Sequence, residues 1–251
     1  MGQFDSPIDG FLSQHKKESK NVIGEVTIEI GGKLQPLVGI SNAIRKLLSS
    51  GGSSESVLEL AESVKLELEY CWKRLKGHDD QLEEFRAKLT SPAFEDAALA
   101  AVDEVRRTVS SEKIQRIASV LVRSFLPIRD EYAPSDVGSL LHEVARLGED
   151  DIFILRLLVE SYESVIKTYP NLHDPNAFTE QAQAVLRRVD ECKIHRDDFY
   201  AHCSRLAGFG FAIETVRNTA RMSPGDYCFR PTRRGVRVLE MISLTARSSG
   251  S

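Results

Sequence analysis

The chain has 251 residues, of which 41% are hydrophobic and 28% are charged, and its formal net charge at pH 7 is −4. This composition is typical of a globular protein, so disorder is not the default expectation, and the length allows one large domain or two small ones. No apolar run approaches the roughly 20 residues of a membrane span, and the first ten residues lack the basic and apolar regions of a secretory signal, so we expect a cytoplasmic protein without membrane contact.

Residues 1–52 are predicted to form an N-terminal arm. A Gly/Ser stretch at 49–54 is predicted to link this arm to the rest of the chain. Val26, Ile28 and Ile30 alternate with polar residues, which is the pattern of a half-buried strand. Gly31-Gly32 then fits a two-residue turn, so we predict a β-hairpin over 25–38. The alternative for this stretch is an amphipathic helix broken by its glycines.

Residues 53–148 have apolar residues at helical spacing and are predicted to form a helical body. Ser56 and Glu59 have the spacing of a capping box at the start of the first helix, and Gly77 fits a left-handed C-cap at its end. Ser91 precedes Pro92 as an N-cap precedes the first residue of a helix. We expect the helix that follows to bury Val109 on its inner face.

Residues 149–245 are predicted to form a second domain, followed by a disordered tail at 246–251. Two helices, at 150–169 and 176–193, precede a short helix that starts at 196. Two strands, at 209–216 and 227–230, are expected to pair, and a last amphipathic helix follows them. Since strands do not alternate with the helices, a parallel α/β fold is excluded. The predicted class is mainly α, a multi-helix bundle with an N-terminal hairpin and a C-terminal winged-helix-like module.

Positive charge is concentrated near the end of the chain. Residues 196–251 contain nine arginines and five acidic residues, a net charge of +4, which leaves −8 for the remainder. Arginine is suited to phosphate binding, so DNA is a candidate partner. Asp197 and Asp198 at the start of the short helix oppose this interpretation. The candidate DNA-binding residues are Arg205, Arg217, Arg221, Arg230, Arg233 and Arg234.

The order of elements in this region, with Leu206-x-Gly208-Phe209 before the first strand and Thr232-x-x-Gly235 before the last helix, resembles the winged helix of MarR- and PadR-type bacterial regulators. The resemblance covers about 50 residues, or up to about 95 if the helices at 150–169 and 176–193 are included. It implies that Thr232 caps the last helix and that Gly235 lets this helix and the strand approach closely.

Three stretches of the chain resemble bacterial abortive-infection alpha-type proteins and related uncharacterised helical proteins. They are SPAFEDAALAAVDEV at 91–105, SSEKIQRIASVLVRSF at 110–125 and LLHEVARLGEDDIFILRLL at 140–158. This resemblance implies a role in phage defence or the stress response, without naming a molecular activity.

Motifs of nucleophilic, phosphate-binding and metalloprotease sites do not occur in the sequence, so we expect no enzymatic activity, no cofactor and no small-molecule substrate. A zinc site is suggested by Cys192, His195, His202 and Cys203. However, His202 and Cys203 are adjacent on a helix and point about 100° apart, so they can rarely both reach one tetrahedral ion, and we expect no metal. The leading prediction is a non-enzymatic interaction or regulatory protein whose helical body binds a protein partner or a second copy of itself. The alternative is a winged-helix DNA-binding regulator.

Overall fold

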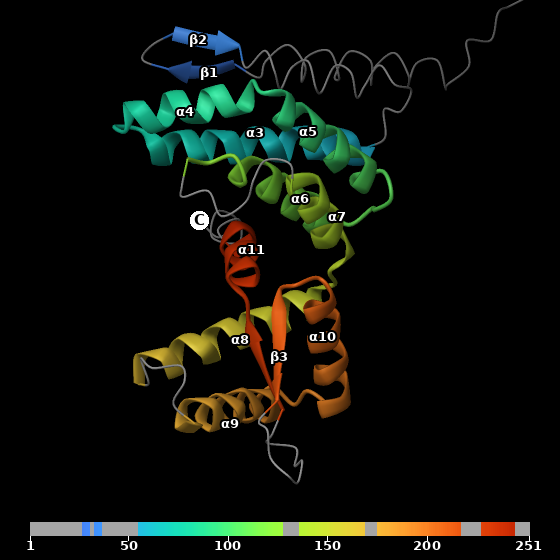
Figure 1. Ribbon diagram of the computed structural model, residues 1–251. Coiled ribbons are helices and arrows are strands. Elements are labelled where there is room, and N and C mark those ends of the chain that lie inside the picture. The colour runs from blue at the N-terminus through green and yellow to red at the C-terminus, as the bar shows by residue number, and fades with distance from the viewer. Residues whose placement is uncertain are drawn as a thin grey trace, which may run out of the picture. The chain divides into compact units, whose positions relative to one another are not determined.

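The computed structural model describes residues 27–30, 33–36, 55–127, 136–168, 175–216 and 227–243. The chain divides into two compact units, Met1–Ala145 and Arg146–Ser251, which we call the N-terminal unit and the C-terminal unit. The described residues are mainly helical (Figure 1), as the sequence predicts. Among them, no helix is both long enough and apolar enough to cross a bilayer.

Two short strands precede the helices of the N-terminal unit. Strands β1 (Thr27–Ile30) and β2 (Lys33–Pro36) pair antiparallel, with Thr27 opposite Pro36 and Ile30 opposite Lys33. The glycines of the predicted turn between them lie outside the described residues, as does the linker at 49–54.

The described residues from 55 to 146 form five helices of the N-terminal unit, and α3 packs most extensively against α6 (Figure 1). Their apolar faces form the core, with Phe85, Phe94 and Phe125 among the largest fully buried side chains. The helices are α3 (Glu55–Leu75), α4 (Asp79–Leu89), α5 (Pro92–Val105), α6 (Ser111–Arg123) and α7 (Val137–Arg146).

The ends of these helices agree with the sequence at some positions and differ at others. Ser91 accepts a hydrogen bond from the Phe94 amide, as an N-cap does, and Gly77 has a φ of 95° after the end of α3. The predicted capping box at Ser56 is wrong, because Ser56 lies inside α3 and donates its hydroxyl to the Thr108 carbonyl. Val109 is 96% exposed, since α5 ends at Val105.

A buried ion pair connects α3 to α6. Arg123 Nε donates to Glu67 Oε2 at 2.8 Å and Arg123 Nη2 donates to Glu67 Oε1 at 3.0 Å, while Ser119 Oγ donates to Oε1 at 3.1 Å. All three side chains are buried among apolar residues. Removing one partner would leave a buried charge uncompensated, so breaking this pair would strongly destabilise the packing of α3 on α6.

In the C-terminal unit, α8 packs against α9, α10, β4 and α11. The predicted pairing of the two strands is confirmed: they are antiparallel, with Ala212 opposite Pro231 and Val216 opposite Tyr227. The elements are α8 (Glu149–Thr168), α9 (Pro175–Glu191), α10 (Arg196–Gly208), β3 (Ala212–Val216), β4 (Tyr227–Pro231) and α11 (Arg233–Ser243).

A tight turn joins α9 to α10. Lys193 has a φ of 56°, its amide donates to the Asp190 carbonyl, and the Ile194 amide donates to the Val189 carbonyl. These are the two hydrogen bonds of a Schellman motif, in which the left-handed residue is usually glycine. Here a lysine occupies that position. The turn leaves only four residues, 192–195, between the end of α9 and the start of α10.

Candidate functional site

The predicted DNA-binding arginines are distributed over three elements of the C-terminal unit. Arg205 lies on α10, Arg230 on β4, and Arg233 and Arg234 at the start of α11. Arg217 and Arg221 lie outside the described residues. The surroundings of the four described arginines determine which of them is available to a partner.

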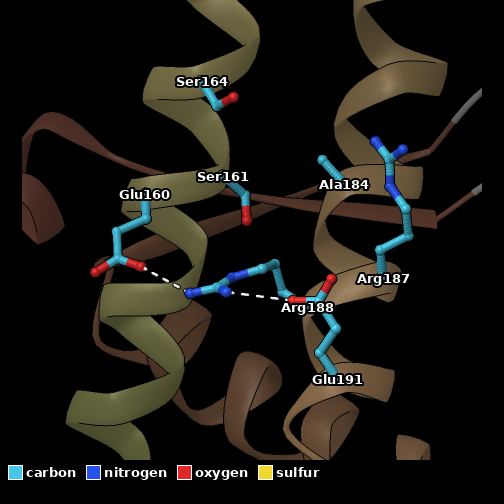
Figure 2. Close-up of a pocket in the computed structure, with 7 residues that line it drawn as sticks. All are labelled: Glu160, Ser161, Ser164, Ala184, Arg187, Arg188 and Glu191. Carbon is cyan, nitrogen blue, oxygen red and sulfur yellow. Dashed lines mark hydrogen bonds and ion pairs between the residues drawn. The ribbon is translucent and has the colours of Figure 1, made fainter.

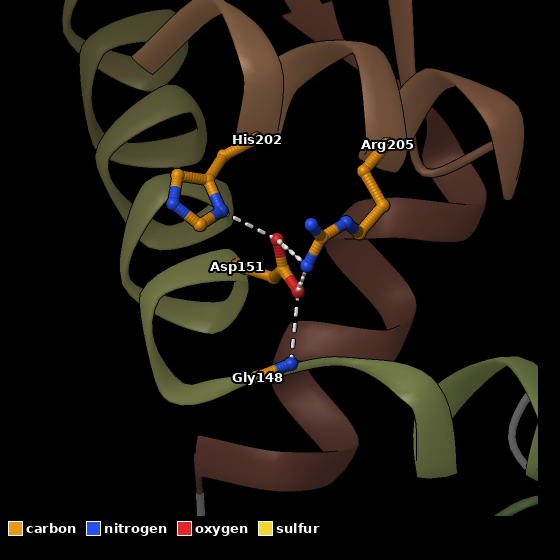
Figure 3. A network of polar contacts seen from close by, with 4 residues as sticks. All are labelled: Gly148, Asp151, His202 and Arg205. Carbon is orange, nitrogen blue, oxygen red and sulfur yellow. Dashed lines mark hydrogen bonds and ion pairs between the residues drawn. The ribbon is translucent and has the colours of Figure 1, made fainter. Parts of the chain in front are cut away.

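Arg205 is held by a buried carboxylate at the start of α8. Figure 3 shows the side chain of Asp151 meeting His202 and Arg205 from α10 and the backbone of Gly148. Arg205 Nη1 lies 3.1 Å from Asp151 Oδ2, and His202 Nδ1 lies 2.7 Å from Asp151 Oδ1. The Gly148 amide donates to Oδ2 at 2.8 Å. The network therefore fixes α10 against the first turn of α8.

The ionisation of Asp151 depends on these contacts. Burial alone raises the pKa of this carboxyl group, but the hydrogen bonds from His202 and the Gly148 amide and the charge of Arg205 outweigh burial and hold its pKa below the ordinary value. Asp151 is therefore a carboxylate at neutral pH. Its bond to Gly148 also caps α8, because the third helical residue accepts from the N-cap amide.

The remaining described arginines have different environments. Arg230 Nε donates to Thr215 Oγ1 at 3.2 Å across the β3–β4 pair. The Arg234 guanidinium lies 5.5 Å from the centroid of the Phe211 ring, a cation–π distance. Arg233 is exposed. Of the four, Arg205 and Arg230 are already engaged by polar groups of the unit itself.

The solvent-facing side of α10 is not basic. Asp197 and Asp198 are exposed in the first turn, and Ala201 and Ser204 are exposed farther along. Arg196 is also exposed, but its Nη2 lies 3.2 Å from Asp190 Oδ2. Both arginines of α10 thus have carboxylate partners, and the helix has as many carboxylates as guanidinium groups.

Thr232 and Gly235 have the positions that the winged-helix resemblance implies. Thr232 Oγ1 accepts from the Gly235 amide at 3.0 Å and donates to the Gly210 carbonyl at 2.7 Å, so it caps α11 and ties it to the segment before β3. A Cβ at Gly235 would lie 2.1 Å from the Phe211 carbonyl oxygen. Only glycine fits at this crossing.

A cleft of about 290 Å³ lies between α8 and α9. Figure 2 shows hydroxyl groups of α8 on one side and arginines of α9 on the other, with the Arg188 side chain extending towards Glu160. The Arg188 guanidinium lies 3.3 Å from Glu160 and 3.2 Å from Glu191, and Arg187 pairs with Glu180 at 2.8 Å. The cleft is lined by Glu160, Ser161, Ser164, Ala184, Arg187, Arg188 and Glu191.

The cysteine and histidine residues considered for zinc have different surroundings. Cys203 is fully buried, Cys192 is exposed, and His202 Nδ1 is occupied by Asp151. Burial raises the pKa of the Cys71 and Cys228 thiols to about 12 and also raises that of Cys203, so these thiols are poorly reactive. Within the described ranges, His, Cys, Asp and Glu residues form no group of three or more that could hold a metal ion.

Sequence reasoning recognised Asp151 only as an acid at a helix start and missed its partners on α10. It also missed the cleft, because Ser161 and Ala184 are ordinary residues of helical patterns. Comparison of the chain with protein families, with curated proteins and with solved structures finds no match.

Proposed function

We propose that this is a non-enzymatic interaction protein that binds its partner through the helical body of the N-terminal unit, and that its C-terminal unit is a winged-helix-like module that does not read DNA. The observation that carries the proposal is the charge of α10. Its first turn exposes Asp197 and Asp198, its Arg205 pairs with the buried Asp151, and its Arg196 forms an exposed pair with Asp190. A helix of this kind placed in a major groove would bring carboxylates towards phosphates.

The winged-helix interpretation itself is supported by the order of elements. Three helices, an antiparallel strand pair and a final helix follow one another, and a link of four residues between α9 and α10 is the length of a helix-turn-helix turn. The contacts of Thr232 and Gly235 agree with it.

The helical body offers a candidate contact surface on α3. Leu66 is 66% exposed and Tyr70, one turn later on the same side of the helix, is 38% exposed. Glu62 and Glu69 flank these two side chains. An exposed tyrosine is the type of aromatic anchor that protein interfaces bury, and the exposed leucine beside it extends the apolar surface. The resemblance to abortive-infection proteins is the reason to look for the partner in phage defence or the stress response.

Site-specific photo-cross-linking in the producing cell tests this proposal. We expect a photoreactive residue at Leu66 to give a discrete adduct with a protein partner or a second copy of the chain. The matched control is Gln81, which is exposed on α4. Equal labelling from both positions, or no adduct from Leu66, would refute the α3 surface.

DNA binding by the arginines around the strands is the second candidate, and the helix-turn-helix order favours it. Binding to duplex DNA at 50 and 200 mM salt separates the two functions. A protein that contacts six or more phosphates loses affinity by about 10³-fold or more over this range. We expect binding that is weak at both salt concentrations, and a steep loss of tight binding would establish the DNA-binding function instead.

A further inference from the structure

We propose that the cleft between α8 and α9 binds a small zwitterion of the free α-amino-acid type. This ligand site is separate from the protein contacts proposed above. The argument rests on a buried hydroxyl group without a partner, on the balance of charges around the cleft and on its size.

The first observation is the hydroxyl group of Ser161. This side chain is only 5% exposed, and its Oγ has no hydrogen-bond partner among the described residues. Figure 2 shows Ser161 pointing into the space between the two helices. Buried polar groups are nearly always hydrogen-bonded, so the cleft is suited to a ligand whose polar group bonds to Ser161 Oγ.

The second observation is that both charges surround the cleft in equal number. Glu160 and Glu191 contribute two carboxylates, and Arg187 and Arg188 contribute two guanidinium groups. A simple anion would meet the carboxylates and a simple cation would meet the guanidinium groups, whereas a zwitterion has a partner for each. Its carboxylate would accept from Ser161 and from an arginine, and its ammonium group would donate to Glu160 or Glu191.

The ion pairs already present do not close the cleft to such a ligand. The side chains of Arg188 and Glu160 are 50% and 52% exposed, and exposed pairs of this kind contribute little to stability. A ligand carboxylate can therefore replace one of these contacts at small cost. The cleft volume of about 290 Å³ is large enough for an amino acid.

Isothermal titration of the full chain with each of the twenty free L-amino acids tests the proposal. At least one should bind with a Kd below about 1 mM. Ser161→Ala should weaken that binding about tenfold, which corresponds to the loss of one hydrogen bond. Ala184→Leu should abolish it by filling the cleft, and Gln183→Leu, at an exposed neighbouring position on α9, should leave it unchanged.

If Ala184→Leu impairs folding, as judged by circular dichroism, Ser164→Leu fills the cleft from the opposite helix and is expected to have the same effect. Absence of binding by all twenty amino acids would overturn the proposal. So would undiminished binding by a folded variant with a filled cleft. Cross-linking from Leu66 tests a different unit of the chain, so either proposal can fail alone.

Discussion

Close atomic contacts restrict which residue can occupy two positions in the C-terminal unit, Gly235 and Asp151. Gly235 has no room for a methyl group, and Asp151 is enclosed by three donors from two segments of the chain. The role of Gly235 is what the winged-helix resemblance implies, because a glycine three residues after a capping threonine forms a recognisable pattern. The role of Asp151 is not recognisable in the same way, because His202 and Arg205 are about fifty residues away in the sequence and only folding brings them to it.

Gly235→Ala should destabilise the C-terminal unit by about 3 kcal/mol or more, because the new Cβ would lie 2.1 Å from a backbone oxygen that cannot rotate away. Chemical denaturation measures the change. Gly208→Ala is the matched control, since a Cβ there meets no atom within 4 Å, and it should be neutral or slightly stabilising. Equal effects of the two variants would contradict the close approach of α11 to Phe211.

Asp151→Asn should cost about 2 kcal/mol at pH 7, because it removes the charge that His202 and Arg205 surround. The folded-state pKa of Asp151 is lowered, so its contribution is complete above the unfolded-state value near 3.9 and is lost as pH falls through the folded-state value. Urea denaturation between pH 7 and pH 3 should therefore show a smaller loss of stability in the variant. Asp150→Asn, at the exposed neighbour, should keep the wild-type pH dependence.

Helices and strands were largely predictable from the sequence, because apolar spacing and cap residues act locally. The predicted strands at 209–216 and 227–230 correspond to the observed pair at 212–216 and 227–231. Errors arose where a long-range contact prevailed over a local pattern. Ser56 has the spacing of a cap, yet its hydroxyl bonds to Thr108, and α5 stops before Val109 although apolar spacing continues. The turn after α9 could not be predicted from the sequence either, because lysine is rare in the left-handed conformation.

Lys193→Gly should stabilise the C-terminal unit by about 0.5–1 kcal/mol, because glycine adopts the left-handed conformation of this turn without the clash of a Cβ. Thermal denaturation should show a higher Tm. Lys193→Ala is the control, because alanine keeps the clash and removes only the charged side chain. A Tm increase of the same size in both variants would point to charge rather than backbone strain.

At the scale of the whole molecule, the chain separates near residue 145 into two units, each with its own buried polar cluster. The sequence-based boundary of 148/149 rested on Gly148 and the acidic residues after it. The ion pair in the N-terminal unit could not be predicted, because Glu67 and Arg123 each lie in a helical pattern that equally suits an exposed side chain. The cleft between α8 and α9 depends on how closely two helices approach, which periodicity does not specify.

Arg123→Ala should destabilise the N-terminal unit by about 3–5 kcal/mol, since it leaves the Glu67 carboxylate buried without its main partner. Hydrogen exchange measured by mass spectrometry should show faster exchange across residues 55–127, with residues 175–216 little changed. Arg106→Ala, at an exposed pair with Asp103, is the control and should alter neither. Faster exchange in both ranges would mean that the units unfold together.

The bond between Asp151 and the Gly148 amide has a practical consequence for dissecting the protein. A truncation that begins at Ile152 would retain nearly all of α8 and yet lack the anchor that orients α10. A truncation that begins at Arg146 would retain the anchor together with the stacking of Arg146 on Phe209 at 5.8 Å. Two fragments that differ by six residues should therefore differ sharply in whether α10 is ordered.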